Sequence, residues 1–136
     1  MKIKNNKGFT GIDISIATVI FIIFSSIMVT LFYNTAVTSK KIERKTTATS
    51  LCIDIIETLK ECPFDSLTNT EDTSMSIETL QTISGKTIEI PNGYIAKIII
   101  EDYKEENVIK ILKVTINYKE NNKTEGVTIE TIVKNL

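Results

Sequence analysis

The chain of 136 residues contains no histidine and no tryptophan. Histidine is the commonest metal ligand and general base, so its absence excludes zinc hydrolases and Ser-His-Asp enzymes in their ordinary forms. The two cysteines, Cys52 and Cys62, are too few for a disulfide framework or a cysteine-only zinc site. The net charge of −1 lacks the basic excess of a nucleic-acid-binding protein. We therefore expect one small domain that is not an enzyme, with no cofactor, no bound metal and no direct contact with nucleic acid.

One N-terminal segment is long and apolar. No charged residue occurs between Asp13 and Lys40, and residues 14–33 alone would span about 30 Å as a helix. That length matches the hydrocarbon core of a bilayer. The segment is rich in Ile, Val and Phe, but in lipid the backbone must satisfy its own hydrogen bonds, which favours a helix. The sequence therefore predicts a membrane-spanning helix.

Three interpretations of this segment compete. A secretory signal peptide needs a shorter apolar region and an A-x-A-like cleavage site, which residues 34–37 match poorly. A permanent single-span anchor, carrying an extracytoplasmic binding or sensing domain, would explain the length. It would not need Asp13, because a carboxylate deep in a bilayer costs about 2.5–3.5 kcal/mol. Such a residue is a candidate for function, and it leads to the third interpretation.

Residues 7–13 read Lys-Gly-Phe-Thr-Gly-Ile-Asp and precede the apolar run. This pattern resembles the leader and N-terminus of type IV prepilins. The resemblance implies that a prepilin peptidase cuts between Gly8 and Phe9, removing residues 1–8, and methylates the new N-terminus of Phe9. It assigns Asp13 to the acidic position four residues after that Phe. The chain departs from the family pattern in having Asp in place of Glu, and Gly11 where an apolar residue is usual.

The implied role of Asp13 is assembly. Cleavage would expose a positive α-amine at Phe9, and the Asp13 carboxylate of a neighbouring subunit could pair with it at low dielectric. Alternatively, Asp13 lies at the membrane interface, near the positive end of the helix dipole. The charges that flank the span do not fix its topology. The resemblance places the N-terminus in the cytoplasm and the remainder outside, at the cell surface or in a pseudopilus.

The resemblance also implies function and partners. The chain would be a structural subunit, a minor pilin or pseudopilin, of a type IV pilus-like or type II secretion-like filament. Its partners would be the prepilin peptidase, other pilin subunits and the cytoplasmic membrane. Pilus, secretion and DNA-uptake (competence) filaments all fit the resemblance equally.

Beyond the span the chain keeps helical periodicity. No Gly or Pro occurs between Ile12 and Cys62, and Pro63 then stops the helix. We expect one helix from about Phe9 to Glu61, with residues 9–33 in the membrane and 34–62 as an amphipathic continuation. The expected apolar stripe consists of Ile42, Ala48, Leu51, Cys52, Ile55, Ile56 and Leu59.

Residues 63–136 are expected to form a globular β domain. Its first part, Leu67–Gly85, is polar and is interpreted as a connecting loop with at most a short strand. From Lys86 onward apolar residues alternate, which predicts an antiparallel sheet with one face on the helix stripe. The fold class is therefore α+β, and pilin-like by resemblance. The strands are expected near residues 94–101, 112–119 and 127–132, with turns at 104–107 and 120–126.

Three further features have ordinary explanations beside functional ones. Cys52 and Cys62 would be about 15 Å apart along one helix, beyond the roughly 7 Å that a disulfide allows, so we expect no bridge between them within the chain; a bridge between subunits stays open. Asn122 begins a glycosylation sequon, but an Asn-Asn pair also suits a hairpin turn. A cluster near one turn could hold a hard cation or simply be solvated. Its members are Glu101, Asp102, Glu105 and Glu106.

Overall fold

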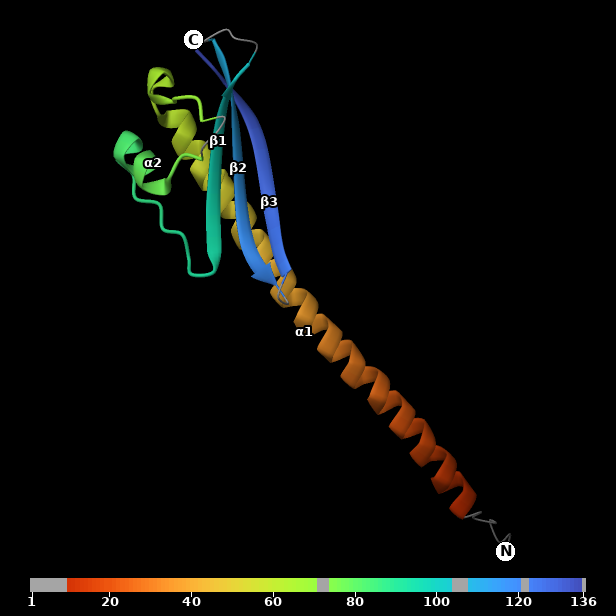
Figure 1. Ribbon diagram of the computed structural model, residues 1–136. Helices are drawn as coiled ribbons and strands as arrows, with labels where there is room; N and C mark the ends of the chain where they lie inside the picture. The colour runs from red at the N-terminus through yellow and green to blue at the C-terminus, as the bar shows by residue number, and fades with distance from the viewer. Residues whose placement is uncertain (1–9, 71–73, 104–107, 121–122, 136) are drawn as a thin grey trace, which may run out of the picture. The chain divides into compact units, whose positions relative to one another are not determined.

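The computed structural model describes residues 10–70, 74–103, 108–120 and 123–135 (Figure 1). The protein is α+β, with a long N-terminal helix followed by a three-stranded antiparallel sheet. Contacts divide the chain into two units, Met1–Lys40 and Lys41–Leu136. Helix α1 (Gly11–Glu61) is continuous through both, and it ends where Pro63 predicts. The later elements are η1 (Phe64–Ser66), α2 (Ile77–Ser84), β1 (Tyr94–Asp102), β2 (Ile109–Glu120) and β3 (Lys123–Lys134).

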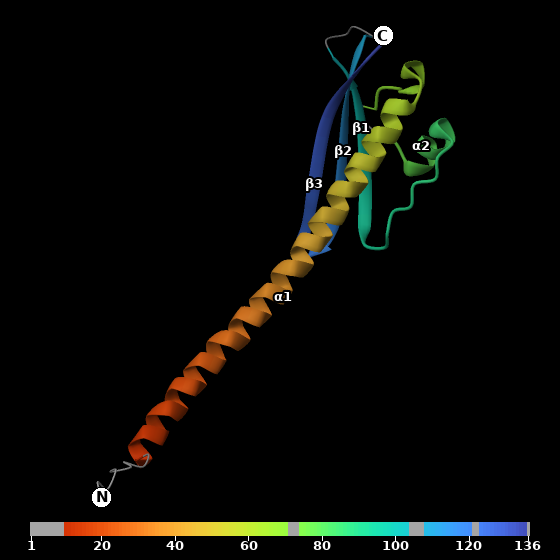
Figure 2. The same ribbon diagram turned by 180° about the vertical axis from the view of Figure 1, so that it is seen from behind.

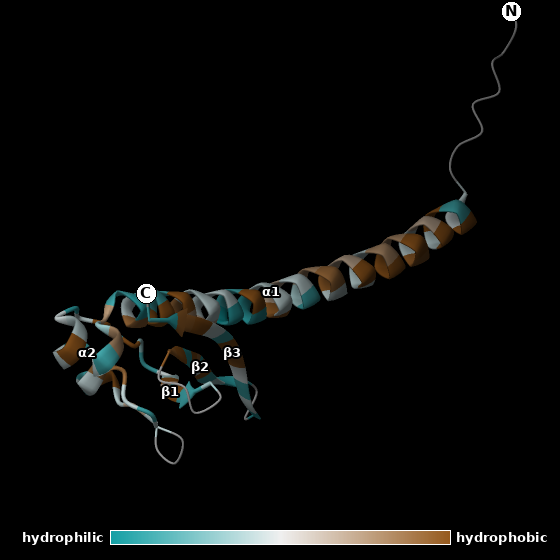
Figure 3. Ribbon diagram, turned by 90° about the horizontal axis from the view of Figure 1, so that it is seen from above, coloured by the Kyte–Doolittle hydropathy of each residue, from teal (hydrophilic) through white to brown (hydrophobic). Residues whose placement is uncertain are grey.

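The first unit consists, in its described part, of α1 as far as Lys40. None of residues 10–40 is buried. Figure 3 shows that apolar residues dominate most of this part of the helix, after a hydrophilic first turn. Hydroxyl side chains interrupt them, and four donate hydrogen bonds of 2.8–3.0 Å to the carbonyl four residues earlier. The helix therefore satisfies these polar groups by itself, as an apolar solvent requires. The four residues are Ser15, Thr18, Ser26 and Thr30.

The second unit contains the sheet, in the order β1-β2-β3, with antiparallel neighbours. Its register places Ile98, Val114 and Ile129 side by side. Side chains alternate between buried and more exposed along β2, which confirms the predicted period of two. Each strand is longer than expected. The second turn is shorter, because β3 already begins at Lys123. The turn expected at 104–107 lies outside the described residues.

The second half of α1 lies across one face of this sheet, and α2 lies beside β1 (Figures 1 and 2). The contact uses what we name the core stripe: Ala48, Leu51, Cys52, Ile55, Ile56 and Leu59, all buried. Ile42 was expected in this stripe, and that prediction is wrong, since 59% of its surface is exposed. Six residues turn a helix by about 600°, which places Ile42 well away from the direction of Ala48. The sheet contributes Ile98, Ile100, Leu112, Val114, Ile116 and Tyr118 to the same core.

The interpretation of Leu67–Gly85 as a connecting loop is wrong in its second half, which forms α2. The Ser76 hydroxyl accepts the Thr79 N–H at 3.2 Å, capping the start of the helix. Gly85, at φ +68°, ends it in the left-handed conformation that glycine allows. Leu80 anchors its inner side in the core with no exposed surface. Met75, just before α2, makes an isolated bridge to Ile98 of β1, so the strand considered there is a single pair.

The core position of Val114 gives a first prediction. Its side chain is fully buried on the face of the central strand that packs on α1, and its carbonyl accepts from the Cys52 thiol at 3.7 Å. Val114→Asp would bury an unpaired carboxylate, which costs several kcal/mol in a small domain. We expect the unfolding midpoint of the full chain in detergent to fall strongly. The matched control is Ile95→Asp on β1, where 69% of the surface is exposed. Equal melting of both variants would contradict the assigned faces of the sheet.

Candidate functional site

Of the three residues assigned to processing and assembly, Gly8 and Phe9 lie outside the described residues. Asp13 lies in the first turn of α1. Its carboxylate does not project freely into the surroundings. One oxygen, Oδ2, accepts hydrogen bonds from the Thr10 N–H at 3.0 Å and from the Thr10 hydroxyl at 2.7 Å. The Asp13 N–H donates to Thr10 Oγ1 at 3.4 Å and to the Thr10 carbonyl at 3.0 Å.

This arrangement is a capping box, with Asp13 in the place that Glu or Gln usually takes. The first N–H groups of a helix have no partner within the helix. Thr10 and Asp13 supply one to each other, so the carboxylate stabilises the start of its own helix. The sequence analysis considered pairing with a neighbouring subunit and the helix dipole at this position, but not a capping box. The Thr-x-x-Asp spacing at the start of the apolar run was the signal that could have shown the box.

The helix surface beside Asp13 is hollowed into a shallow apolar groove of about 400 Å³. A second groove of about 470 Å³ follows it on the same helix, where the small side chains of Ser25 and Ser26 line the surface. Both grooves open to the surroundings. The first one joins a carboxylate to an apolar surface, which suits a ligand that carries a positive charge next to an apolar group. Its lining residues are Asp13, Ile14, Ala17, Thr18 and Phe21.

Among the described residues, α1 is the one helix that has the length and apolar composition of a membrane span. Core helices of soluble proteins and signal sequences can share these two properties. Here the apolar window has no buried residue, unlike a core helix. One helix near the N-terminus is thus long and apolar enough to cross a membrane.

The acidic cluster expected near the first turn divides. Glu105 and Glu106 lie outside the described residues. Asp102 faces the Lys110 ammonium at 4.0 Å and accepts from Asn69 Nδ2 at 3.2 Å. Lys110 is buried, and it also donates to the carbonyl of Leu67. These bonds tie the segment after α1 to the end of the sheet. A side-chain cation therefore already neutralises Asp102.

Lys110 also lies over the Phe64 ring, 4.9 Å from its centroid, in cation–π contact. The sequence analysis missed this lysine, because it placed the start of the strand at Leu112. Lys110 faces inward because it precedes the buried Leu112 by two residues on β2, and the register places it opposite Asp102 of β1.

Both cysteines are free and buried, as the helix spacing predicts. The Cys52 thiol donates to the carbonyls of Val114 and Val127, and the Cys62 thiol donates to the carbonyl of Thr58. Burial raises the pKa of both thiols, so they stay protonated at neutral pH. They act as small core residues. Asn122 of the sequon lies outside the described residues.

The capping box gives a second prediction. Thr10→Val removes the hydroxyl that both donates to and accepts from Asp13, and losing such a cap costs about 1 kcal/mol. We expect the first-turn amides of the full chain in detergent micelles to exchange roughly fivefold faster by NMR. Thr18→Val is the control, since that hydroxyl bonds only to the Ile14 carbonyl. Unchanged exchange in Thr10→Val would show that the box does not hold the helix start.

The long apolar helix at the N-terminus and the small antiparallel sheet are both consistent with a pilin-like protein. No family model matches the chain, and comparison with curated proteins and with solved structures also finds no match.

Proposed function

We propose that this chain is a structural subunit of a type IV pilus-like or type II secretion-like filament, processed between Gly8 and Phe9 and assembled through α1. One observation carries the proposal. The Asp13 carboxylate borders an apolar groove, on a helix whose apolar surface has no partner among the described residues. A carboxylate there is costly in lipid unless it pairs with another group, so it is a candidate for function.

The groove fits the group that processing would create. Cleavage after Gly8 leaves a positive α-amine attached to the apolar side chain of Phe9. In a neighbouring subunit, the amine would pair with Asp13 while the ring lies against Ile14, Ala17 and Phe21. Away from water such a pair is strong, and an unpaired charge of either sign is costly. Assembly would thus be favoured only for processed subunits.

The same proposal sets the topology. Before assembly α1 would hold the chain in the cytoplasmic membrane, with Met1–Gly8 in the cytoplasm and the second unit outside. Four hydroxyls of residues 15–30 bond to the helix's own carbonyls, so they would not be left unpaired in lipid. Helix α1 would then move from lipid into a bundle of equivalent helices, a second apolar environment.

A second candidate function is a permanent single-span anchor for an extracytoplasmic binding domain. The capping box favours it, because it gives Asp13 a role inside one chain. In that case no cleavage takes place, and the carboxylate does no more than hold the start of the helix. Processing therefore separates the two candidates.

The third prediction concerns cleavage. The intact mass of the protein extracted from membranes that contain the prepilin peptidase should lack Met1–Gly8 and carry one added methyl group. Gly8→Val should leave the precursor uncut, because a side chain there would keep the backbone from a membrane-embedded active site. Gly11→Val is the control, since a side chain at Gly11 meets no atom within 4 Å. An uncut wild-type chain would favour the permanent anchor.

The fourth prediction concerns Asp13 in assembly. Asp13→Glu keeps the charge and should enter sheared filaments normally. Asp13→Ala and Asp13→Asn should still be cleaved, because Asp13 lies outside the leader, but should accumulate in the membrane and not in filaments. The measurement is the ratio of filament to membrane protein for each variant. Equal ratios for Asp13→Ala and wild type would remove the carboxylate from the assembly step.

A further inference from the structure

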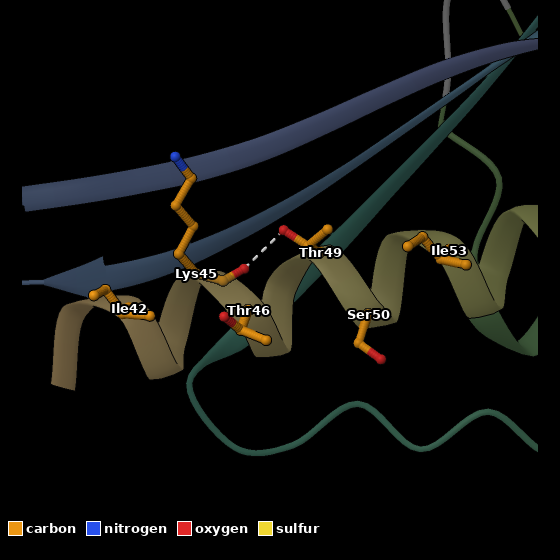
Figure 4. Close-up of a pocket in the computed structure, with 6 residues that line it drawn as sticks. All are labelled: Ile42, Lys45, Thr46, Thr49, Ser50 and Ile53. Atoms are coloured by element: carbon orange, nitrogen blue, oxygen red, sulfur yellow. Dashed lines mark hydrogen bonds between the residues drawn. The ribbon is translucent and has the colours of Figure 1, made fainter. Parts of the chain in front are cut away.

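The side of α1 that packs on the sheet is apolar from Ala48 onward and basic in the residues before it. Counting back from Ala48 by three and then four residues gives Lys45 and Lys41, so both continue the line of the core stripe. Arg44 lies beside them on the same side. All three are exposed, whereas the core stripe is buried. In Figure 4 the Lys45 side chain extends toward the side on which β2 and β3 are drawn.

The nearby end of the sheet adds two more basic residues. The Arg44 guanidinium donates to the Lys119 carbonyl at 2.8 Å, and the Tyr94 hydroxyl donates to the Arg44 carbonyl at 3.4 Å. These bonds fix α1 against the point where β2 ends and β3 begins. Lys119 and Lys123 are exposed there, with Lys119 on the outer face of the sheet because it follows the buried Tyr118. We name the five residues the basic patch: Lys41, Arg44, Lys45, Lys119 and Lys123.

Acidic residues do not cancel this patch. Two of them, Glu120 and Glu125, lie close by. Burial and then these two carboxylates raise the pKa of Tyr118, while Arg44 lowers it. Glu43 follows Lys41 by two residues, which places it on the opposite side of the helix. Five positive charges thus meet two negative ones.

The other end of the same helix has the reverse balance. Asp54, Glu57 and Glu61 there outnumber Lys60, and Lys86 pairs with Glu61. The second unit is therefore electrically polar along α1, with its positive end at residues 41–45.

The sequence around this positive end has the order found at a membrane surface. The apolar run ends at Tyr33, an aromatic residue of the kind enriched at interfaces. Six uncharged residues, Asn34–Ser39, follow, and the basic residues come next. Basic side chains next to a span are attracted to an anionic lipid surface.

We propose that the basic patch binds the headgroup phosphates of anionic phospholipids in the leaflet from which the second unit emerges. This inference rests on the membrane insertion of α1 in the proposed function. Charge complementarity selects the ligand, since a zwitterionic headgroup would bring its own cation to the same lysines. Arg44, held at its carbonyl and its guanidinium, gives the patch a fixed centre. Lys41 and Lys45 supply mobile charges around it.

The test uses the full chain in nanodiscs made of equal parts phosphatidylglycerol and phosphatidylcholine. Native mass spectrometry counts the lipids of each kind that stay bound on ejection. We expect wild type to retain mainly phosphatidylglycerol, and Lys41→Gln/Lys45→Gln to lose that preference roughly tenfold. Lys41→Arg/Lys45→Arg should keep it. The matched control is Lys60→Gln/Lys134→Gln, with the same loss of charge at exposed positions outside the patch.

The outcomes separate this inference from the proposed function. A wild-type chain that enters the nanodisc without any lipid preference overturns the inference alone. A chain that fails to enter overturns the span and the inference together. An equal loss in the Lys60→Gln/Lys134→Gln control also overturns the inference, because net charge would then act without the patch. If the Lys41→Gln/Lys45→Gln chain retains as much phosphatidylglycerol as wild type but is absent from filaments, the inference is overturned, and the patch contacts the acidic end of another subunit instead.

Discussion

The domain depends on one contact, between the core stripe of α1 and the inner face of the sheet. A three-stranded sheet with one apolar face is not stable by itself in water. Every fully buried strand residue, from Ile98 to Ile116, lies on that face, and the helix supplies the opposite half of the core. Two other contacts stabilise the edges of this core. Leu80 of α2 closes one side, and Lys110 ties the segment after α1 to the sheet.

That contact also limits what the rest of α1 can do. Its second half is committed to the sheet along one line of residues, and the line turns basic at Lys45 and Lys41. Its first half has no such line, since apolar side chains surround it. One uninterrupted helix thus has a second half suited to a protein core and a first half suited to an apolar solvent. A filament subunit that moves from lipid into a helix bundle needs both.

The sequence predicted what periodicity controls. Alternation located three strands, because one covered face imposes a period of two, and Pro63 marked the helix end. The sequence-based prediction failed where a few residues determine the local structure. Helix α2 was read as loop, although Ser76 and Gly85 cap it and Leu80 anchors it. Lys110 was missed because the strand was begun at Leu112, although a period of two continued back from Leu112 already turns Lys110 inward. Its pairing with Asp102 depends on the register of two strands, which no local pattern reveals.

Under the proposed function, the Asp13 carboxylate would serve two states. In the single chain it accepts from Thr10, so fewer N–H groups are left unpaired where the helix begins. A carboxylate has more than two acceptor positions, and its Oδ1 atom makes no hydrogen bond to Thr10. An incoming amine could therefore bind Asp13 while the capping box stays intact. The box would then orient the carboxylate in advance, so that pairing costs little side-chain entropy. The shorter reach of Asp, compared with Glu, ties the charge more closely to the helix start and leaves the partner to approach it.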